Sequence, residues 1–109
     1  MLFTDYNDFF EKASRLERTS RDEELALARL MIEGDREARQ KLINSYIPVV
    51  AAFVRRVSKE MCSLEMIYRC ITALEHEVDT FDFLQTGESF THRLNIVLRR
   101  ELTRFIADK

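Results

Sequence analysis

The chain contains no tryptophan, a single proline and only two glycines among its 109 residues. So few turn-forming residues exclude a fold built from many short strands and favour a small number of long helices. The alternation of apolar and polar residues that is typical of strands is also absent. With 46% hydrophobic and 33% charged residues, the chain has the composition of one folded domain with a modest core.

Metal-binding and membrane signals are scarce as well. The two cysteines, Cys62 and Cys70, match no zinc motif, and two histidines cannot complete a metal site. We therefore expect reduced, at least half-buried thiols and no cofactor. The apolar runs are too short to span a bilayer, and acidic residues interrupt any apolar start. These features predict a cytoplasmic protein without a membrane contact.

Charge is nearly balanced overall but unevenly distributed. A net charge of −2 argues against a strongly basic nucleic-acid binder. Acidic residues nevertheless gather in residues 11–37, and the last predicted helix is locally basic, so it could follow phosphates. Its basic residues are Arg93, Arg99, Arg100, Arg104 and Lys109. No nucleophile triad, glycine-rich phosphate loop or metal set is visible, and we therefore predict that the protein is not an enzyme.

Apolar residues at spacings of three and four predict an all-α, compact bundle of about five helices. We expect them at about residues 5–18, from Ser20 to Gly34, at about residues 36–59, from Ser63, and from Ser89 onwards. Thr4, Ser20, Asp35, Ser63 and Ser89 are the expected N-caps. Gly34 is the expected residue after the second helix, so that the second and third helices meet at a tight corner.

Two features of the longer predicted helices bear on the core. Pro48 lies inside the third helix and should kink or split it. The fourth and fifth helices carry regular apolar stripes, which most simply form the core. These stripes are Leu64, Ile67, Ile71, Leu74, Val78 and Phe81 in the fourth helix, and Phe90, Leu94, Leu98, Leu102 and Phe105 in the fifth.

Two segments, in the right order and at the right separation, resemble a known family. Residues 23–28, the Gly-Asp-x-x-Ala-Arg corner at residues 34–39, and Tyr-Ile-Pro-Val-Val at residues 46–50 are similar to regions 1.2 and 2.1 of the sigma-70 family. Residues 81–108 resemble the part of these factors that meets the promoter −10 element. The resemblance implies one domain, in which residues 1–34 are similar to region 1.2 and residues 35–109 to region 2.

The resemblance implies a docking surface for RNA polymerase core. In the family, region 2.2 binds the clamp coiled coil of the largest subunit through an Asp-Leu-x-Gln-Glu-Gly motif. An ungapped alignment places this motif on residues 65–70. The implied polymerase-binding residues are Glu65, Met66, Tyr68 and Arg69. Tyr68 replaces the family's Gln, and Arg69 reverses the charge of the family's Glu.

Region 2.4 implies DNA-binding residues in the last helix. The family's Ile-Arg-Gln-x-Ile-Thr-Arg corresponds to residues 98–104, where Arg99 and Arg104 would contact phosphates. Arg100 and Thr103 would meet base edges, and Arg100 suits guanine. Arg93 shares a helix face with Arg100 and Arg104.

The aromatic residues with which the family opens DNA are largely missing. Region 2.3 contributes aromatics that stack on bases, including a Trp-Trp pair. Here the corresponding positions are Phe90, which we expect in the core, and the aliphatic pair Ile96 and Val97. Because stacking is worth about 1–3 kcal/mol per base, we expect weak strand opening.

Two functions follow as alternatives. The first is a sigma-factor-like domain in transcription initiation, which binds polymerase core and −10-like promoter DNA. The second is a degenerate sigma-like interaction module that does not open DNA and instead pairs with a second sigma polypeptide or an anti-sigma factor. The retained Arg-Arg-x-x-Thr-Arg favours the first, and the missing aromatics favour the second.

Overall fold

The computed structural model describes residues 3–57, 63–85 and 87–108. They form five α-helices and, within those ranges, no strand. The helices are α1 (Tyr6–Ser14), α2 (Arg21–Ile32), α3 (Arg36–Arg55), α4 (Leu64–Thr80) and α5 (Phe90–Ala107). The predicted all-α bundle of five helices is thus confirmed. None of these helices, over the described residues, is long and apolar enough to cross a membrane.

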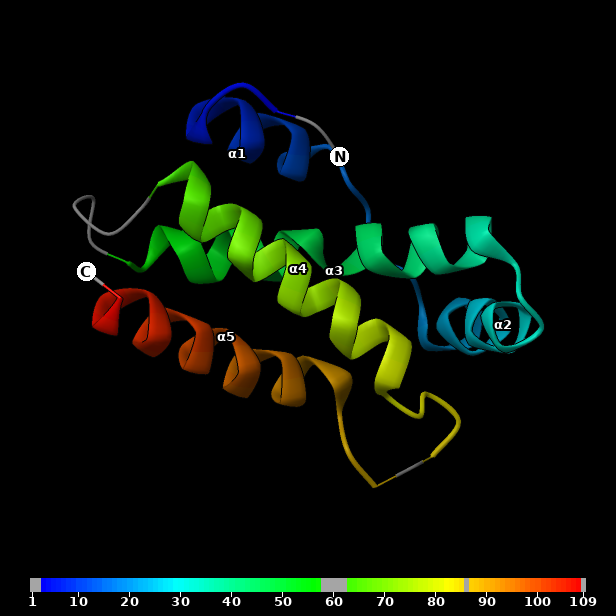
Figure 1. Cartoon of the computed structure of the whole chain (residues 1–109). Coiled ribbons are helices and arrows are strands. Elements are labelled where there is room, and N and C mark those ends of the chain that lie inside the picture. Colours follow the sequence, from blue (N-terminus) through cyan, green and yellow to red (C-terminus); the bar gives the residue numbers. More distant parts are fainter. Residues whose placement is uncertain (1–2, 58–62, 86, 109) are drawn as a thin grey trace.

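The longest helix, α3, is the centre of the bundle. It packs against each of the four other helices, and α4 and α5 also pack against each other. Figure 1 shows α4 crossing α3, α5 running along the lower side, and α2 seen end-on beyond one end of α4. Such a central position requires apolar residues on more than one face, as the sequence of α3 shows.

Side-chain caps define where the helices begin. Ser20, Asp35, Ser63 and Ser89 each accept a hydrogen bond from the backbone N–H three residues later, as predicted. Each such cap contributes about 1 kcal/mol. The prediction was wrong for α1, where the cap is Asp5 rather than Thr4.

The first helix is shorter than predicted and begins one residue later. The Asp5 carboxylate accepts from the backbone N–H of Asp8 at 2.8 Å. The backbone N–H of Thr4 donates instead to the Asp8 carboxylate at 2.9 Å, so Thr4 lies outside the helix. The helix ends at Ser14 and does not reach Arg18.

The corner between α2 and α3 follows from one glycine. Gly34 has a φ of +99°, a conformation that L side chains rarely adopt. Its N–H donates to the Met31 carbonyl at 2.9 Å, and the N–H of Asp35 donates to the Leu30 carbonyl at 3.0 Å. This Schellman pattern satisfies the last carbonyls of α2, and Asp35 then caps α3 at once.

Pro48 does not split α3, and this part of the prediction was wrong. The helix is continuous from Arg36 to Arg55 with Pro48 inside it. Proline leaves the carbonyl of Asn44 without its helical donor. Both Pro48 and Asn44 are only half-buried, so this carbonyl lies on a partly open side of the helix. The predicted end at Lys59 lies outside the described residues.

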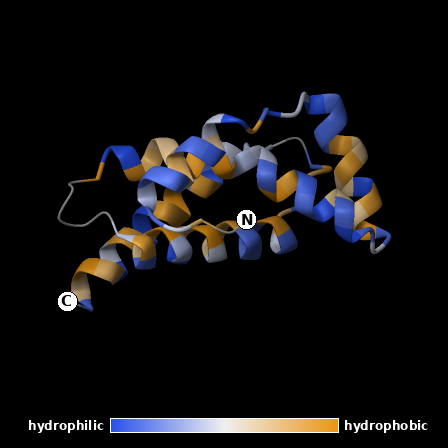
Figure 2. Ribbon diagram, turned by 90° about the horizontal axis from the view of Figure 1, so that it is seen from above, coloured by the Kyte–Doolittle hydropathy of each residue, from blue (hydrophilic) through white to orange (hydrophobic). Residues whose placement is uncertain are grey.

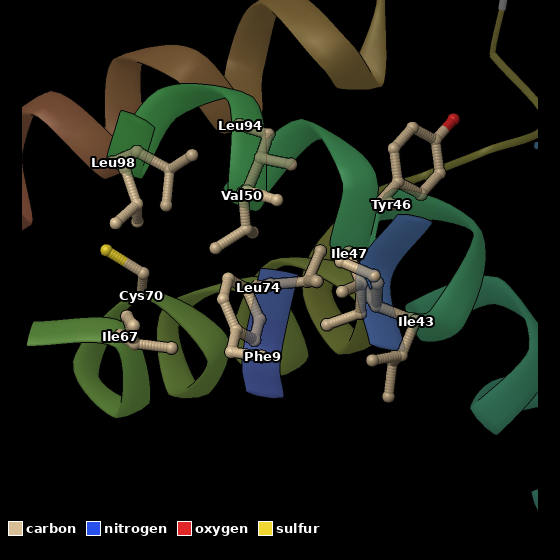
Figure 3. Packing of buried hydrophobic residues seen from close by; sticks show 14 of the residues in the cluster. Phe9, Ile43, Tyr46, Ile47, Val50, Ile67, Cys70, Leu74, Leu94 and Leu98 are labelled. Carbon is tan, nitrogen blue, oxygen red and sulfur yellow. The ribbon is translucent and has the colours of Figure 1, made fainter. Parts of the chain in front are cut away.

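The core brings together side chains from α1, α3, α4 and α5. Figure 3 shows Phe9, Val50, Leu74, Leu94 and other residues of these helices converging, and all four of those side chains are fully buried. Figure 2 shows apolar and hydrophilic residues alternating around the turns of the helices. Burial of each large aliphatic side chain contributes about 1.5–3 kcal/mol.

The stripe of α4 is rotated from the predicted one. Met66 and Cys70 are buried at 1% and 0% exposure, whereas Leu64 and Ile71 are only partly buried at the edge of the core. The Cys70 side chain is fully buried, as expected. Cys62 lies outside the described residues.

A buried polar cluster fastens α2 to α3 and to the segment before α5. The Tyr46 hydroxyl of α3 donates a hydrogen bond to the Glu24 carboxylate of α2. Arg21 pairs with the other oxygen of Glu24 at 2.8 Å and donates to the Phe83 carbonyl at 3.3 Å. Burial and the Glu24 carboxylate together raise the pKa of Tyr46 well above its usual range.

Arg39 of the corner motif fixes α3 to α4. Its guanidinium binds the Asp79 carboxylate through two hydrogen bonds of 2.6 and 2.9 Å. The hydrogen bond from Arg39 lowers the pKa of Asp79 below its usual range. This two-point geometry links α3 to α4, and α4 forms one wall of the groove described next.

Candidate functional site

A groove of about 930 Å³ runs between α4 and α5. We call it the α4–α5 groove. It contains most of the residues predicted for polymerase and for DNA. The side chains that line it are Glu65, Tyr68, Arg69, Thr72, Ala73, His76, Glu77, Arg93, Val97, Arg100, Glu101 and Arg104.

Ion pairs cross this groove near the end of α5. Arg69 of α4 lies 3.2 Å from the Asp108 carboxylate and 3.7 Å from that of Glu101. Glu101 also binds Arg104 at 3.2 Å. The Arg69 guanidinium further lies 5.6 Å from the centre of the Phe105 ring. Arg69 thus reaches across to α5, and Glu101 partly neutralises two of the groove's arginines.

The middle of the groove contains the least neutralised cation. Arg93 pairs with Glu77 at 3.4 Å, and Arg104 pairs with Glu101. Arg100 is exposed and has no ion-pair partner among the residues that the structure describes. Arg93, Arg100 and Arg104 all face the groove, as their spacing of seven and four residues predicted. Arg100 is therefore the member of this set most ready to meet an anion.

Comparison with known proteins adds the decisive observation. The chain is 30% identical over 102 residues to an RNA polymerase sigma factor SigA of Listeria monocytogenes. It is similarly 30% identical over 102 residues to a SigA protein of Clostridium acetobutylicum. Both alignments cover 93% of the chain and 27% of the relative. No family model matches the chain.

The chain is a distant homologue of the sigma-70 factors. The homology extends over nearly the whole chain, which agrees with the resemblance in its two segments. The chain spans about a quarter of the length of these SigA relatives.

Among its described residues, no group of three or more histidines, cysteines and carboxylates could hold a metal ion.

The four residues predicted to bind polymerase do not share one face. Glu65 is exposed, and Tyr68 is 41% exposed with its ring stacked on Phe3 at 4.7 Å between centroids. Met66 is a core residue, and this is a correction to its prediction as a surface contact. Its side chain points inward because the apolar stripe of α4 passes through it.

The positions that correspond to the sigma −10 motif are also divided. Arg99 faces the other side of α5, in a groove shared with α3. Thr103 is exposed, and its hydroxyl donates to the Arg99 carbonyl at 3.0 Å. A helix turns by about 100° per residue, so the neighbours Arg99 and Arg100 diverge. No single surface can therefore use both arginines equally.

The aromatic positions of the sigma motif are buried or aliphatic. Phe90 is 4% exposed and packs on Tyr46, Phe81 and Phe83, so its predicted place in the core is confirmed. Val97 is 7% exposed, whereas Ile96 is 38% exposed. None of these three positions thus presents an aromatic ring to a base.

The carboxylates that pair with these arginines were not singled out from the sequence. Glu77, Glu101 and Asp108 each bind an arginine that had been assigned to polymerase or DNA. Only the pair of Glu101 and Arg104, three residues apart, had a local signal. The other pairs join α4 to α5 and depend on how these helices cross.

Proposed function

We propose that the chain acts in transcription initiation as a sigma-factor-like module that binds RNA polymerase core and −10-like promoter DNA. The observation that supports this best is its similarity, over 93% of its length, to proteins named RNA polymerase sigma factors. In this proposal the chain binds and positions its partners and performs no chemistry of its own.

Promoter DNA would contact the exposed basic face of α5. Arg100, which has no carboxylate partner in the described structure, would read a base edge, and the exposed Thr103 would assist. Arg93 and Arg104, on the same side of α5 as Arg100, would contact phosphates once they separate from Glu77 and Glu101. Arg99 lies on the other side of α5 and would reach a phosphate only at the edge of this surface, so we expect it to contribute less.

Polymerase would contact the exposed part of α4. Glu65 and Tyr68 are accessible, and Arg69 would have to leave Asp108 and Glu101 to reach the clamp coiled coil. Met66 would support this surface from within the core. Because Tyr68 and Arg69 line the same groove as Arg100 and Arg104, a partner seated in the groove would cover both sets.

One observation favours the second candidate, an interaction module that pairs with a second sigma polypeptide or an anti-sigma factor. The ring of Phe90 is buried, and Ile96 and Val97 have no ring at all. A domain without an exposed ring at these three positions lacks there the interaction worth about 1–3 kcal/mol per base in single-strand binding.

The test of DNA binding uses fluorescence anisotropy with a labelled −10 duplex, with and without polymerase core. Arg100→Ala should lose roughly 1–3 kcal/mol of binding at one base pair and relax preference there. Lys41→Ala removes an exposed cation of α3 far from this face and should leave binding unchanged. Equal effects of the two variants, or none with either, would leave the interaction module as the better proposal.

The test of polymerase binding uses Glu65→Lys, which reverses an exposed charge without breaking an ion pair of the described structure. Glu37→Lys is the matched control, also exposed and likewise in the first turn of its helix, α3. Glu65→Lys alone should weaken association with polymerase core in a sedimentation assay. Arg69→Glu is unsuitable, because it would place a third carboxylate beside Glu101 and Asp108.

A further inference from the structure

A second groove, of about 400 Å³, lies between α3 and α5, on the side of α5 that faces away from α4. We call it the α3–α5 groove. Its apolar walls are Phe53 and Val57 of the α3 end and Leu102 and Ile106 of α5. Phe53, Val57 and Leu102 are partly buried against the core, and Ile106 is 48% exposed. The groove therefore leaves apolar surface in contact with water. A partner that covered this surface would gain the free energy of its burial.

The charged residues that line this groove are all positive. Arg56 and Arg99 are both exposed there, and Asn95 is the remaining polar residue. Over the ranges that the structure describes, no carboxylate lines the groove and neither arginine has an ion-pair partner. The α4–α5 groove differs in this respect, because Glu65, Glu77 and Glu101 lie among its arginines.

The kind of apolar side chain in this groove favours one type of occupant over another. Nucleic-acid bases stack on exposed rings, and among the described residues of this groove the one aromatic ring, that of Phe53, is partly buried. The remaining walls are the aliphatic side chains of Val57, Leu102 and Ile106, which suit aliphatic anchors. Helices that bind in grooves insert such anchors at spacings of three, four and seven residues.

We propose that the α3–α5 groove is the docking site for an acidic amphipathic helix of a partner protein. Its aliphatic face would cover Leu102, Ile106 and Val57, and its flanking carboxylates would pair with Arg56 and Arg99. Two cations at the edge of an apolar groove steer an acidic partner and repel a basic one. This site goes beyond the proposed binding of DNA and polymerase, and Arg56 belongs to neither of those sets.

The experiment titrates the full chain, labelled with ¹⁵N, with two synthetic helical peptides. Both carry leucines at every third and fourth position, and their flanks are glutamate in one and lysine in the other. We expect the glutamate peptide to bind at least about tenfold more tightly at low salt. Its amide shifts should centre on Phe53, Asn95, Leu102 and Ile106.

Charge-reversal variants complete the test. Arg56→Glu should remove the preference for the glutamate peptide, whereas Lys41→Glu, with the same change in net charge on the same helix, should retain it. Arg56→Gln should give an intermediate preference for the glutamate peptide. It is also the milder change if Arg56→Glu fails to fold, and circular dichroism checks the folding of each variant. DNA binding should be the same in Arg56→Gln and the parent chain, which separates this proposal from the previous one.

Several results would overturn the proposal. They are equal binding of the two peptides, shifts centred on the α4–α5 groove, or an equal loss in Arg56→Glu and Lys41→Glu. Self-association of the free chain that Arg56→Gln abolishes would identify a second copy as the occupant instead. Shifts of the same amides by a single-stranded oligonucleotide, and not by the glutamate peptide, would identify nucleic acid.

Discussion

Removing the Tyr46 hydroxyl should measurably destabilise the fold. In Tyr46→Phe the ring stays in place against Phe90, and only the hydrogen bond to the Glu24 carboxylate is lost. The Glu24 side chain is 9% exposed, so water replaces the lost donor poorly. A buried acceptor left without its partner costs free energy because its desolvation is no longer compensated.

The magnitude follows from the remaining partner. Hydrogen bonds to charged groups contribute about 1.5–3 kcal/mol. Glu24 keeps Arg21 at 2.8 Å on its other oxygen, and the Arg21 side chain is 54% exposed. We therefore expect a loss near the lower end, about 2 kcal/mol, in the free energy of unfolding. For a domain of this size this corresponds to a fall of about 8 °C in Tm.

The assay is urea and thermal unfolding followed by circular dichroism. Tyr68→Phe is the matched control, because its hydroxyl lies 3.5 Å from the Phe3 carbonyl and Tyr68 is 41% exposed. That control should change stability by less than about 0.5 kcal/mol. If Tyr46→Phe is as stable as the control, the buried cluster does not hold α2 to α3 in the way we describe.

Tyr46 also predicts how the free energy of unfolding changes at alkaline pH. The pKa of Tyr46 is raised in the folded chain, so the folded state holds this proton more tightly than the unfolded state does. Stability from this group is complete below the unfolded pKa of about 10 and falls as pH rises above it. Tyr46→Phe lacks this step, so the stability difference between the two proteins should shrink above about pH 10.

Three further predictions concern single positions. Arg39→Ala should lower stability at pH 7 by at most about 1 kcal/mol, because the pair with Asp79 is half-exposed, and the loss should vanish as acid titration through the lowered pKa protonates Asp79. Pro48→Ala should raise the urea midpoint, since it restores a donor to the Asn44 carbonyl inside a continuous helix, and a lower midpoint would contradict this. Ile96→Trp should tighten binding of a single-stranded −10 oligonucleotide about tenfold, as read from quenching of the sole tryptophan, whereas unchanged binding would show that this position meets no base.

The sequence by itself determined where most helices begin and where α2 turns into α3. Ser20, Asp35, Ser63 and Ser89 cap their helices as predicted, and Gly34 adopts its positive φ. These outcomes depend on hydrogen bonds within three to five residues, so the local sequence contains all the partners. The one misplaced cap, at Thr4, involved two adjacent residues that could both serve as caps.

The sequence predicted most of the buried residues of α4 and α5, but not the full width of the buried face of α4. The stripe of α5 was read correctly at Phe90, Leu94 and Leu98. In α4 the prediction was correct at Ile67, Leu74 and Val78 but left out the buried Met66 and Cys70. Apolar spacing gives the existence of a buried face, but the neighbouring helices decide how wide that face is.

The tertiary structure alone decided how the candidate site is assembled. It paired Arg69 with Asp108 and Arg93 with Glu77, and it set Arg99 against α3 and Arg100 against α4. The two ion pairs join residues far apart in the chain, and they depend on the angle and offset at which the helices cross. Local sequence sets which charges each helix offers and the pair within α5, Glu101 with Arg104, but the packing of the helices sets which of the other charges are already neutralised.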